Sequence, residues 1–541
     1  MFLDLLSLLI LYFSIIGFSV ETKKIIFNNA NIKIFNLDFF YGLLALCLIA
    51  IFLNFFFPLE YFGRIFLIIG LILFLKNLRR KLYKINFLNI FLISVFLVFI
   101  FKINGLAYDS ALYHFQVIKW ISNYKISFGL SNLEPRFGIN SLWHVFISFL
   151  NINYLGLKFI YIFNYLPLVI LIAEFFKKEK NFLSDLFLFF SICFIFTFAI
   201  LHPFQNGVML NLIGSPEVDT VAMTFFILSL YTFIKYLKEK KIDDINLIFI
   251  ISSLTLLVKI SHLSAIFFAI IIFFSQSKIV LFTRLNFSIL LLTIFWFIRS
   301  LILSGCLIFP AAKTCFDKLY WSHPSDNVIL NANAWTSFSR DTRLRLKAGD
   351  FDHTINSFNW VKPWINDYLF NTAFFKAMYF IFIISILIFL LKKIIKIESY
   401  KIPKKILFLI PIYLISFYIW FKNPEIRLGY GPLVTITSIS ITLVMYFQVF
   451  EKYFIKYSKI IVAFLIVTLA LKNINNINLI NNNEEKYSRN YLHIKIIDNN
   501  LEIYSPDENN FCYDFEKICV IEKNNKYKIE EYYNYYLFLR S

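Results

Sequence analysis

Carboxylates stand at two places where long apolar runs end or begin, and such residues can act as bases or bind metals. Asp109, in AYDSALYH, follows the apolar run of residues 86–102, and Glu217 and Asp219, in SPEVD, come directly before another run. Two carboxylates separated by one residue can converge on a divalent cation such as Mg²⁺ or Mn²⁺ through their oxygens. Two plainer alternatives are that Asp109 caps a helix and that the acidic pair complements a helix dipole.

Basic and aromatic side chains near these motifs could bind an anionic substrate. Arg427, in NPEIRLGYG, offers a planar array of donors that suits the phosphate of a lipid-linked substrate, and a phospholipid headgroup is the alternative occupant. Arg299 lies near the outer end of an apolar run, where a guanidinium is costly and usually has an anionic partner. Tyr113, His114 and Arg136 complete the candidate substrate-binding residues, and the alternative for His114 is an interfacial hydrogen bond.

The segment after Asp109 has the pattern of an amphipathic helix lying in the membrane interface. Leu112, Phe115 and Ile118 face one way. The opposite face carries polar and aromatic residues, namely Asp109, Tyr113, Gln116 and Trp120. Such a helix would hold one carboxylate at the outer membrane surface, beside aromatic rings.

The apolar runs that must position these residues are long enough to cross a bilayer as helices. The chain is 59% hydrophobic and 16% charged, with 69 Phe, and a hydrocarbon core of ~30 Å needs about 20 apolar residues per helix. We therefore expect an all-α polytopic membrane protein with about fourteen transmembrane helices. Their predicted ranges are 2–20, 39–57, 61–76, 86–102, 154–175, 182–200, 219–236, 244–258, 262–276, 285–303, 372–391, 406–421, 432–450 and 459–473. Lys259 and His262 interrupt the run 244–276, which indicates a tight turn or a broken helix.

The net charge of +19 would suggest a nucleic-acid partner, but its distribution does not. The Lys and Arg residues form short clusters in alternate loops between the apolar runs, as the positive-inside rule expects of cytoplasmic loops. The N-terminus and the remaining loops are then predicted to lie outside, namely 103–140, 201–218, 303–371 and 422–431, together with the tail 474–541.

Four of the six cysteines form two close pairs on this outer side, Cys306 with Cys315 and Cys512 with Cys519. An oxidising compartment allows disulfides there. A metal site is the alternative, but neither pair has the C-x-x-C spacing or a flanking His. No P-loop, G-x-G-x-x-G, H-E-x-x-H or G-x-S-x-G motif occurs, so nothing supports ATP hydrolysis, nicotinamide chemistry, or zinc or serine proteolysis.

Taken together, the motifs AYDSALYHFQVIKW, EPRFGINSLWH, IRSLILSGCLIFP and NPEIRLGYG resemble the GT-C superfamily of membrane glycosyltransferases, and more closely a poorly characterised group of bacterial multi-spanning proteins placed near it. The superfamily includes protein mannosyltransferases and aminoarabinose transferases. In it, an acidic residue lies in the first outer loop of the core, before amphipathic juxtamembrane helices, and a second acidic motif lies in the next outer loop. Asp109 and the Glu217/Asp219 pair take these places here.

The resemblance implies a GT-C-like core over residues 78–473, three additional N-terminal helices in 1–77, and a small extracytoplasmic tail. It implies an enzyme of the bacterial cytoplasmic membrane that transfers a sugar from a polyprenyl-phosphate donor to a glycan, lipid or protein acceptor. Asp109 would be the general base. Arg427 and Arg299 would hold the leaving phosphate, and Glu217 and Asp219 would bind a metal or orient the acceptor. The alternatives are an O-antigen-type polymerase or ligase that uses Arg and His of 303–371, and a polysaccharide or lipid transporter.

Overall fold

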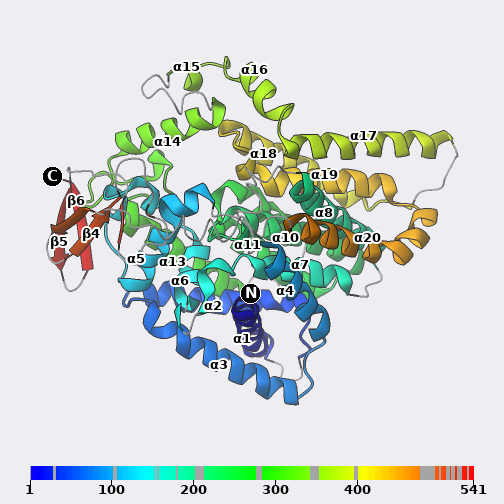
Figure 1. Ribbon diagram of the computed structural model, residues 1–541, viewed down its shortest axis with the longest axis horizontal. Coiled ribbons are helices and arrows are strands. Elements are labelled where there is room, and N and C mark those ends of the chain that lie inside the picture. The colour runs from blue at the N-terminus through cyan, green and yellow to red at the C-terminus, as the bar shows by residue number, and fades with distance from the viewer. Residues whose placement is uncertain are drawn as a thin grey trace.

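The computed structural model is a mostly helical body with small β-hairpins at one end (Figure 1). It describes residues 2–28, 32–101, 107–151, 153–154, 157–177, 181–201, 213–275, 283–341, 352–394, 400–474, 494–498, 501–506, 512, 518–520, 527–532 and 535–540. A helix overlaps each of the predicted apolar segments. These helices are α1 (Phe2–Phe27), α2 (Phe39–Asn54), α3 (Glu60–Arg79), α4 (Phe87–Phe101), α7 (Tyr165–Phe176), α8 (Phe182–Leu201), α10 (Asp219–Glu239), α11 (Ile242–Val258), α12 (Ile266–Ser275), α13 (Arg284–Ser304), α17 (Ala373–Ile394), α18 (Leu409–Lys422), α19 (Tyr430–Met445) and α20 (Gln448–Ile474).

Nine helices of the described part are long and apolar enough to cross a membrane. The most apolar stretch of α10 is 94% buried, so this helix lies at the centre of the bundle, whereas that of α17 is only 22% buried. Peripheral helices such as α3 expose apolar side chains, among them Ile65, Ile68 and Ile72, which suits contact with lipid tails. The described helices therefore fit a multi-pass membrane protein, and the count of about fourteen crossings stays a prediction.

Small residues let α1 and α3 pack closely, as is common between membrane helices. A Cβ atom on Gly17 would lie 2.0 Å from the carbonyl oxygen of Gly70, and one on Gly70 would lie 2.6 Å from the carbonyl oxygen of Ser14. Only glycine fits at these two positions, so the contact between the helices depends on them.

The helix predicted over 154–175 begins later in the structure. A short pair of strands, β1 (Asn153–Tyr154) and β2 (Leu157–Lys158), comes first, and α7 begins at Tyr165. Pro167 explains this start, because proline is tolerated in the first turn of a helix and disrupts its interior. The run 244–276 is a broken helix, since α11 ends at Val258 and a 3-10 segment (η7, Ile260–Ala265) separates it from α12.

The first outer loop of the predicted core folds into a π-helical turn (η2, Ser110–His114), α5 (Phe115–Asn123), two 3-10 turns (η3, Leu130–Asn132; η4, Pro135–Gly138) and α6 (Leu142–Leu150). The later loop 303–371 contains η9 (Ala312–Thr314), α14 (Ser325–Arg340), α15 (Asp352–Ile355), α16 (Val361–Trp364) and the π-helical η11 (Ile365–Leu369). The C-terminal hairpins are β3–β4 (Ile494–Asp498, Leu501–Ser505) and β5–β6 (Tyr527–Tyr532, Tyr535–Arg540), each antiparallel.

The tail packs on this first outer loop, which changes the environment of α5. Phe128 exchanges two backbone hydrogen bonds of 2.9 Å with β6, and the ring of Phe538 lies edge-to-face on Trp120. Gln116 accepts a 3.0 Å hydrogen bond from the backbone N–H of Cys519. The helix that was predicted to lie in the membrane interface is therefore covered by the tail on the face of Gln116 and Trp120, which are 0% and 2% exposed.

Candidate functional site

Asp109 and Arg427 form an ion pair at the centre of the candidate site. Asp109 directly precedes the π-helical turn η2, and its side chain makes no capping hydrogen bond. Its carboxylate accepts a hydrogen bond from Nη1 of Arg427, in the 3-10 turn η13 (Ile426–Gly429) before α19. Nε of Arg427 also donates to Glu425 over 2.6 Å. The carboxylate of Asp109 is thus directed at a guanidinium, and the helix-cap alternative is not what the structure shows.

The protonation of Asp109 follows from two opposing effects. Burial raises the pKa of this carboxyl, while the charge and hydrogen bond of Arg427, with a contribution from His114, lower it. The attraction prevails, and the pKa of Asp109 lies below its ordinary value of 3.8. At neutral pH the group is therefore an ionised carboxylate.

The π-helical turn directs a second side chain toward the other acidic motif. Nε2 of His114 lies 3.0 Å from Oε2 of Glu217, and Oγ of Ser110 donates to Oε1 of the same carboxylate over 3.0 Å. Glu217 is fully buried. π-Helical turns are rare and frequent at functional sites, and this one brings Ser110 and His114 to Glu217 while Asp109 meets Arg427.

The backbone around Glu217 is fixed by buried amide hydrogen bonds. Nδ2 of Asn164 donates to the carbonyl oxygens of Ser215 and Glu217 over 2.6 and 2.5 Å, and Nε1 of Trp143 donates to Oδ1 of Asn164 over 2.7 Å. The backbone N–H of Ala107 donates to Oγ of Ser215 over 3.0 Å. The two acidic segments are thereby held against each other independently of their charges.

Asp219 has a different partner from Glu217. Its carboxylate pairs with Lys259, at the break between α11 and η7. In the same break, Nε2 of His262 accepts a 3.2 Å hydrogen bond from the backbone N–H of Gly431. The broken helix thus joins the second acidic motif to the segment that carries Arg427, and the expected convergence of Glu217 and Asp219 on one cation is not what the structure shows.

A different set of three side chains has the spacing of metal ligands. One oxygen of Asp109, one nitrogen of His114 and one oxygen of Glu217 all lie within 4.8 Å of one another. Among the described residues, Nδ1 of His114 is buried without a hydrogen-bond partner, while Oε2 of Glu217 has its contact with Nε2 of His114. With Asp219 and Glu425 the group contains four carboxylates against two cations, Arg427 and Lys259, which is a formal charge of −2 with His neutral. These donors and this charge suit a divalent cation.

A family model described as a domain of unknown function (DUF8201) matches residues 1–434. The chain belongs to this family. No curated protein and no solved structure matches it. The DUF8201 match contains the six charged residues of the site, namely Asp109, Glu217, Asp219, Lys259, Glu425 and Arg427. It also includes residues 1–77, which the resemblance treated as an addition, and it ends before the C-terminal tail.

Two other predicted site residues of the DUF8201 domain have separate partners. Arg299 is 3% exposed, and it donates to the amide oxygens of Asn54, over 3.3 Å, and Asn140. Neutral amides thus stand where an anionic partner was expected. Arg136 pairs with Glu134 over 2.9 Å. Tyr113 lies against His114, with ring centroids 4.1 Å apart, so it belongs to the wall of the site.

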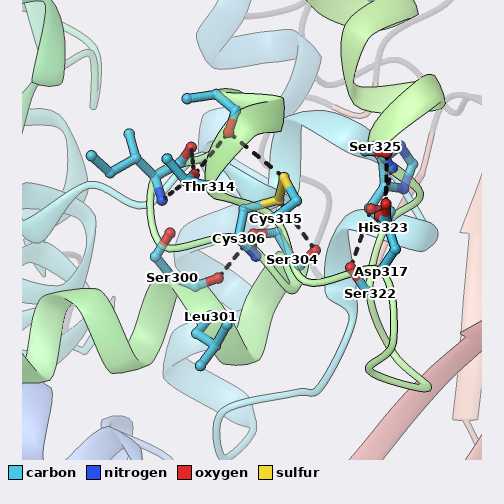
Figure 2. The surroundings of a disulfide bond; sticks show 12 residues. Ser300, Leu301, Ser304, Cys306, Thr314, Cys315, Asp317, Ser322, His323 and Ser325 are labelled. Carbon is cyan, nitrogen blue, oxygen red and sulfur yellow. Dashed lines mark hydrogen bonds between the residues drawn. A yellow bond between two sulfur atoms is a disulfide. The ribbon is translucent and has the colours of Figure 1, made fainter.

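Both cysteine pairs are disulfide-bonded. Figure 2 shows the first, Cys306–Cys315, in the loop after α13, inside the DUF8201 match. The backbone N–H of Cys306 donates to Oγ of Ser304 over 3.2 Å, which ties the bridge to the last turn of α13. Cys512–Cys519 lies in the tail, beyond the family match.

Sequence reasoning missed Ser110, Lys259, Glu425 and Asn164 as members of the site. Lys259 had a signal, because a lysine that interrupts an apolar run needs a counter-ion. Glu425 stands two residues before Arg427 in the motif NPEIRLGYG. Ser110 and Asn164 gave none, since small polar residues are common near helix ends.

Proposed function

We propose that this protein is a membrane glycosyltransferase with a GT-C-like core that moves a sugar from a polyprenyl-phosphate donor to a glycan, lipid or protein acceptor. The transfer takes place at the outer face of a bacterial cytoplasmic membrane. The observation that carries the proposal is the pairing of an ionised Asp109 with Arg427, beside the buried Glu217 and His114. A carboxylate and a guanidinium are the groups that a base and a phosphate clamp require.

In the proposed reaction the acceptor hydroxyl oxygen forms a bond to the anomeric carbon while the bond from that carbon to the donor phosphate oxygen breaks. The hydroxyl proton goes to the carboxylate of Asp109. The leaving phosphate takes the electron pair, and Arg427 stabilises its charge. Attack from the face opposite the phosphate inverts the anomeric centre.

The ion pair has a consequence for the timing of this step. While Arg427 holds Asp109, the low pKa of the carboxyl makes it a weak base. A donor phosphate competes for the same guanidinium because phosphate, like carboxylate, accepts bidentate hydrogen bonds from Arg. Once Arg427 turns to the phosphate, burial raises the pKa of Asp109, and the base gains strength only when the donor is present.

A divalent cation, Mg²⁺ or Mn²⁺, has a fitting set of ligands in Asp109, His114 and Glu217. When bound, such a cation supplies positive charge next to the donor phosphate. Glu217 would remain in place without it, since the hydroxyl of Ser110 and the side-chain amide of Asn164, which donates to the backbone carbonyl of Glu217, hold this segment.

The polymerase or ligase alternative depends on basic residues of 303–371. Of these, Arg340 donates to the carbonyl oxygens of Thr354 and Lys422 over 2.8 and 3.0 Å and stacks on Trp360. A guanidinium with three such contacts connects α14 to its neighbours, which favours the Asp109 group as the site of chemistry.

The test is the lipid-linked sugar content of a deletion strain, measured by mass spectrometry of extracted lipids. We expect one polyprenyl-phosphate sugar to accumulate, and we expect the wild-type gene but not Asp109→Asn to clear it. An unchanged profile of lipid-linked sugars in the deletion strain contradicts the proposal.

A further inference from the structure

Two adjoining cavities lie beside α4, which packs against both α7 and α20 (Figure 1). The first, of about 170 Å³, is an apolar groove. Its lining is Asn89, Leu92, Ile93, Phe96 and Leu97 of α4, Ile172 and Phe176 of α7, and Ala463, Ile466 and Val467 of α20. The second, of about 230 Å³, is polar and shares Asn89 and Phe176 with the first. Each is far larger than the ~30 Å³ share of one water, so an elongated amphipathic molecule can occupy both.

The polar cavity has the chemistry of an anion site. Lys84 and Lys177 line it together with the amides of Asn36, Asn86 and Asn89, and Lys177 also forms a 3.3 Å ion pair with Glu174. Lys84 is exposed at the mouth. Asn36 is 93% buried, and its Oδ1 has no hydrogen-bond partner among the described residues. A buried amide end without a partner is costly, and because the amide can turn its Nδ2 to the cavity, a phosphate or hydroxyl placed there would satisfy it.

The two cavities are ordered along the membrane normal. Asn36, Lys84 and Lys177 belong to three different loops that the charge pattern assigns to the cytoplasm. At the same end, Nζ of Lys459 donates to the carbonyl oxygen of Phe176 over 3.1 Å. The apolar groove continues from there between the helices, so the polar cavity lies at headgroup level and the groove at the level of the lipid tails.

We propose that this composite site binds an anionic phospholipid of the cytoplasmic leaflet. Its phosphate lies between Lys84 and Lys177 beside Asn36, and an acyl chain follows the groove between α4, α7 and α20. Charge selects the occupant, since basic pockets between membrane helices on the cytoplasmic side favour anionic headgroups. The site is separate from the Asp109 group, which lies beyond the opposite end of α4, and it does not depend on the proposed enzymatic activity.

The test compares phosphatidylglycerol with phosphatidylcholine, two probes that share acyl chains and differ in headgroup charge. Native mass spectrometry of the full-length protein in detergent gives an apparent Kd for each lipid. We expect phosphatidylglycerol to bind at least about five-fold more tightly, because one lysine near an anionic headgroup contributes about that factor. Lys84→Glu should abolish this preference, whereas Lys404→Glu, an exposed cytoplasmic lysine away from the cavities, should keep it.

A second variant tests the groove without touching a charge. Ala463→Trp fills the space beside α4 and should weaken the binding of both lipids. Ile460 is exposed on the same helix outside the groove, so Ile460→Trp should leave the binding of both lipids unchanged. Equal affinity of the wild-type protein for the two lipids overturns the proposal. An Ala463→Trp protein that elutes as the wild type in size exclusion and binds phosphatidylglycerol unchanged also overturns it.

Discussion

Asp109 and Arg427 are 318 residues apart in the chain and share one ion pair. The pair joins the first outer loop of the predicted core to the turn that begins α19. It leaves Asp109 without a capping role, so the carboxylate is explained either by chemistry or by this ion pair alone. Variants of the two residues distinguish these explanations.

Asp109→Asn should abolish glycan synthesis while the protein is still inserted and folded. The variant keeps the shape of the side chain but removes the base, which typically costs about 10²–10⁴ in rate. Activity is measured as the clearance of accumulated lipid-linked sugar in the deletion strain. Asp367→Asn, an exposed carboxylate in the predicted outer loop 303–371, is the matched control and should stay active.

If Asp109 serves only the ion pair, Arg427→Gln and Asp109→Asn should have the same small effect on activity and the double variant should add nothing. A fully active Asp109→Asn protein would remove the general-base role from Asp109.

Arg427→Gln should change how the protein responds to pH. In the wild-type protein the pKa of Asp109 lies below 3.8, so the acid limb of kcat/KM lies below this pH. Without the guanidinium, burial raises the pKa of the carboxyl, and the limb should move to higher pH. A profile of the variant that superimposes on that of the wild type contradicts the assignment.

The same pKa shift predicts opposite effects of acid on stability. A depressed pKa in the folded state stabilises the protein above the unfolded pKa, and this contribution is lost as pH falls through the folded pKa. In Arg427→Gln the pKa of Asp109 is higher in the folded than in the unfolded state. Protonation of Asp109 at low pH therefore removes the free-energy cost of keeping its charge buried. Thermal melting from pH 7 to below pH 3.8 should therefore show a smaller loss of stability toward acid in the variant.

Phe538→Ala should loosen the tail from the first outer loop. Phe538 is fully buried, lies against Trp120 and donates its backbone N–H to the carbonyl oxygen of Phe128, and truncating a buried Phe costs about 3–5 kcal/mol. We expect proteolysis of the tail to become faster than in the wild type. Phe358→Ala, at a residue 77% exposed, should not change it, and equal cleavage of both variants would contradict the docking.

Cysteine labelling tests the orientation on which the site depends. In a chain with Cys47 and Cys193 replaced by Ala, Tyr320→Cys should react with an impermeant thiol reagent added outside, and Lys405→Cys should not. Both positions are exposed, and the basic clusters assign them to opposite sides. Reaction of both from one side would show that the orientation is wrong.

The disulfides give an independent measurement. Peptide mapping without reduction should recover Cys306 linked to Cys315 and Cys512 linked to Cys519. Free thiols at all four positions would place both segments in a reducing compartment.

The sequence by itself determined where the helices lie, because an apolar run of sufficient length has few alternatives to a helix in a membrane. It also singled out Asp109, His114, Glu217 and Arg427 as candidate site residues, since polar and charged residues next to such runs are costly and stand out. Helix ends were less certain, and Pro167 decided one of them through the local rule that proline stays in a first turn.

Only the tertiary structure decided which charges meet. Glu217 and Asp219 are separated by one residue, yet Glu217 faces His114 and Asp219 pairs with Lys259. Arg299 was expected to hold an anion and instead contacts two amides. These pairings depend on how helices distant in sequence pack against one another, and apolar periodicity carries no information about that, because in lipid each helix is equally apolar on several faces.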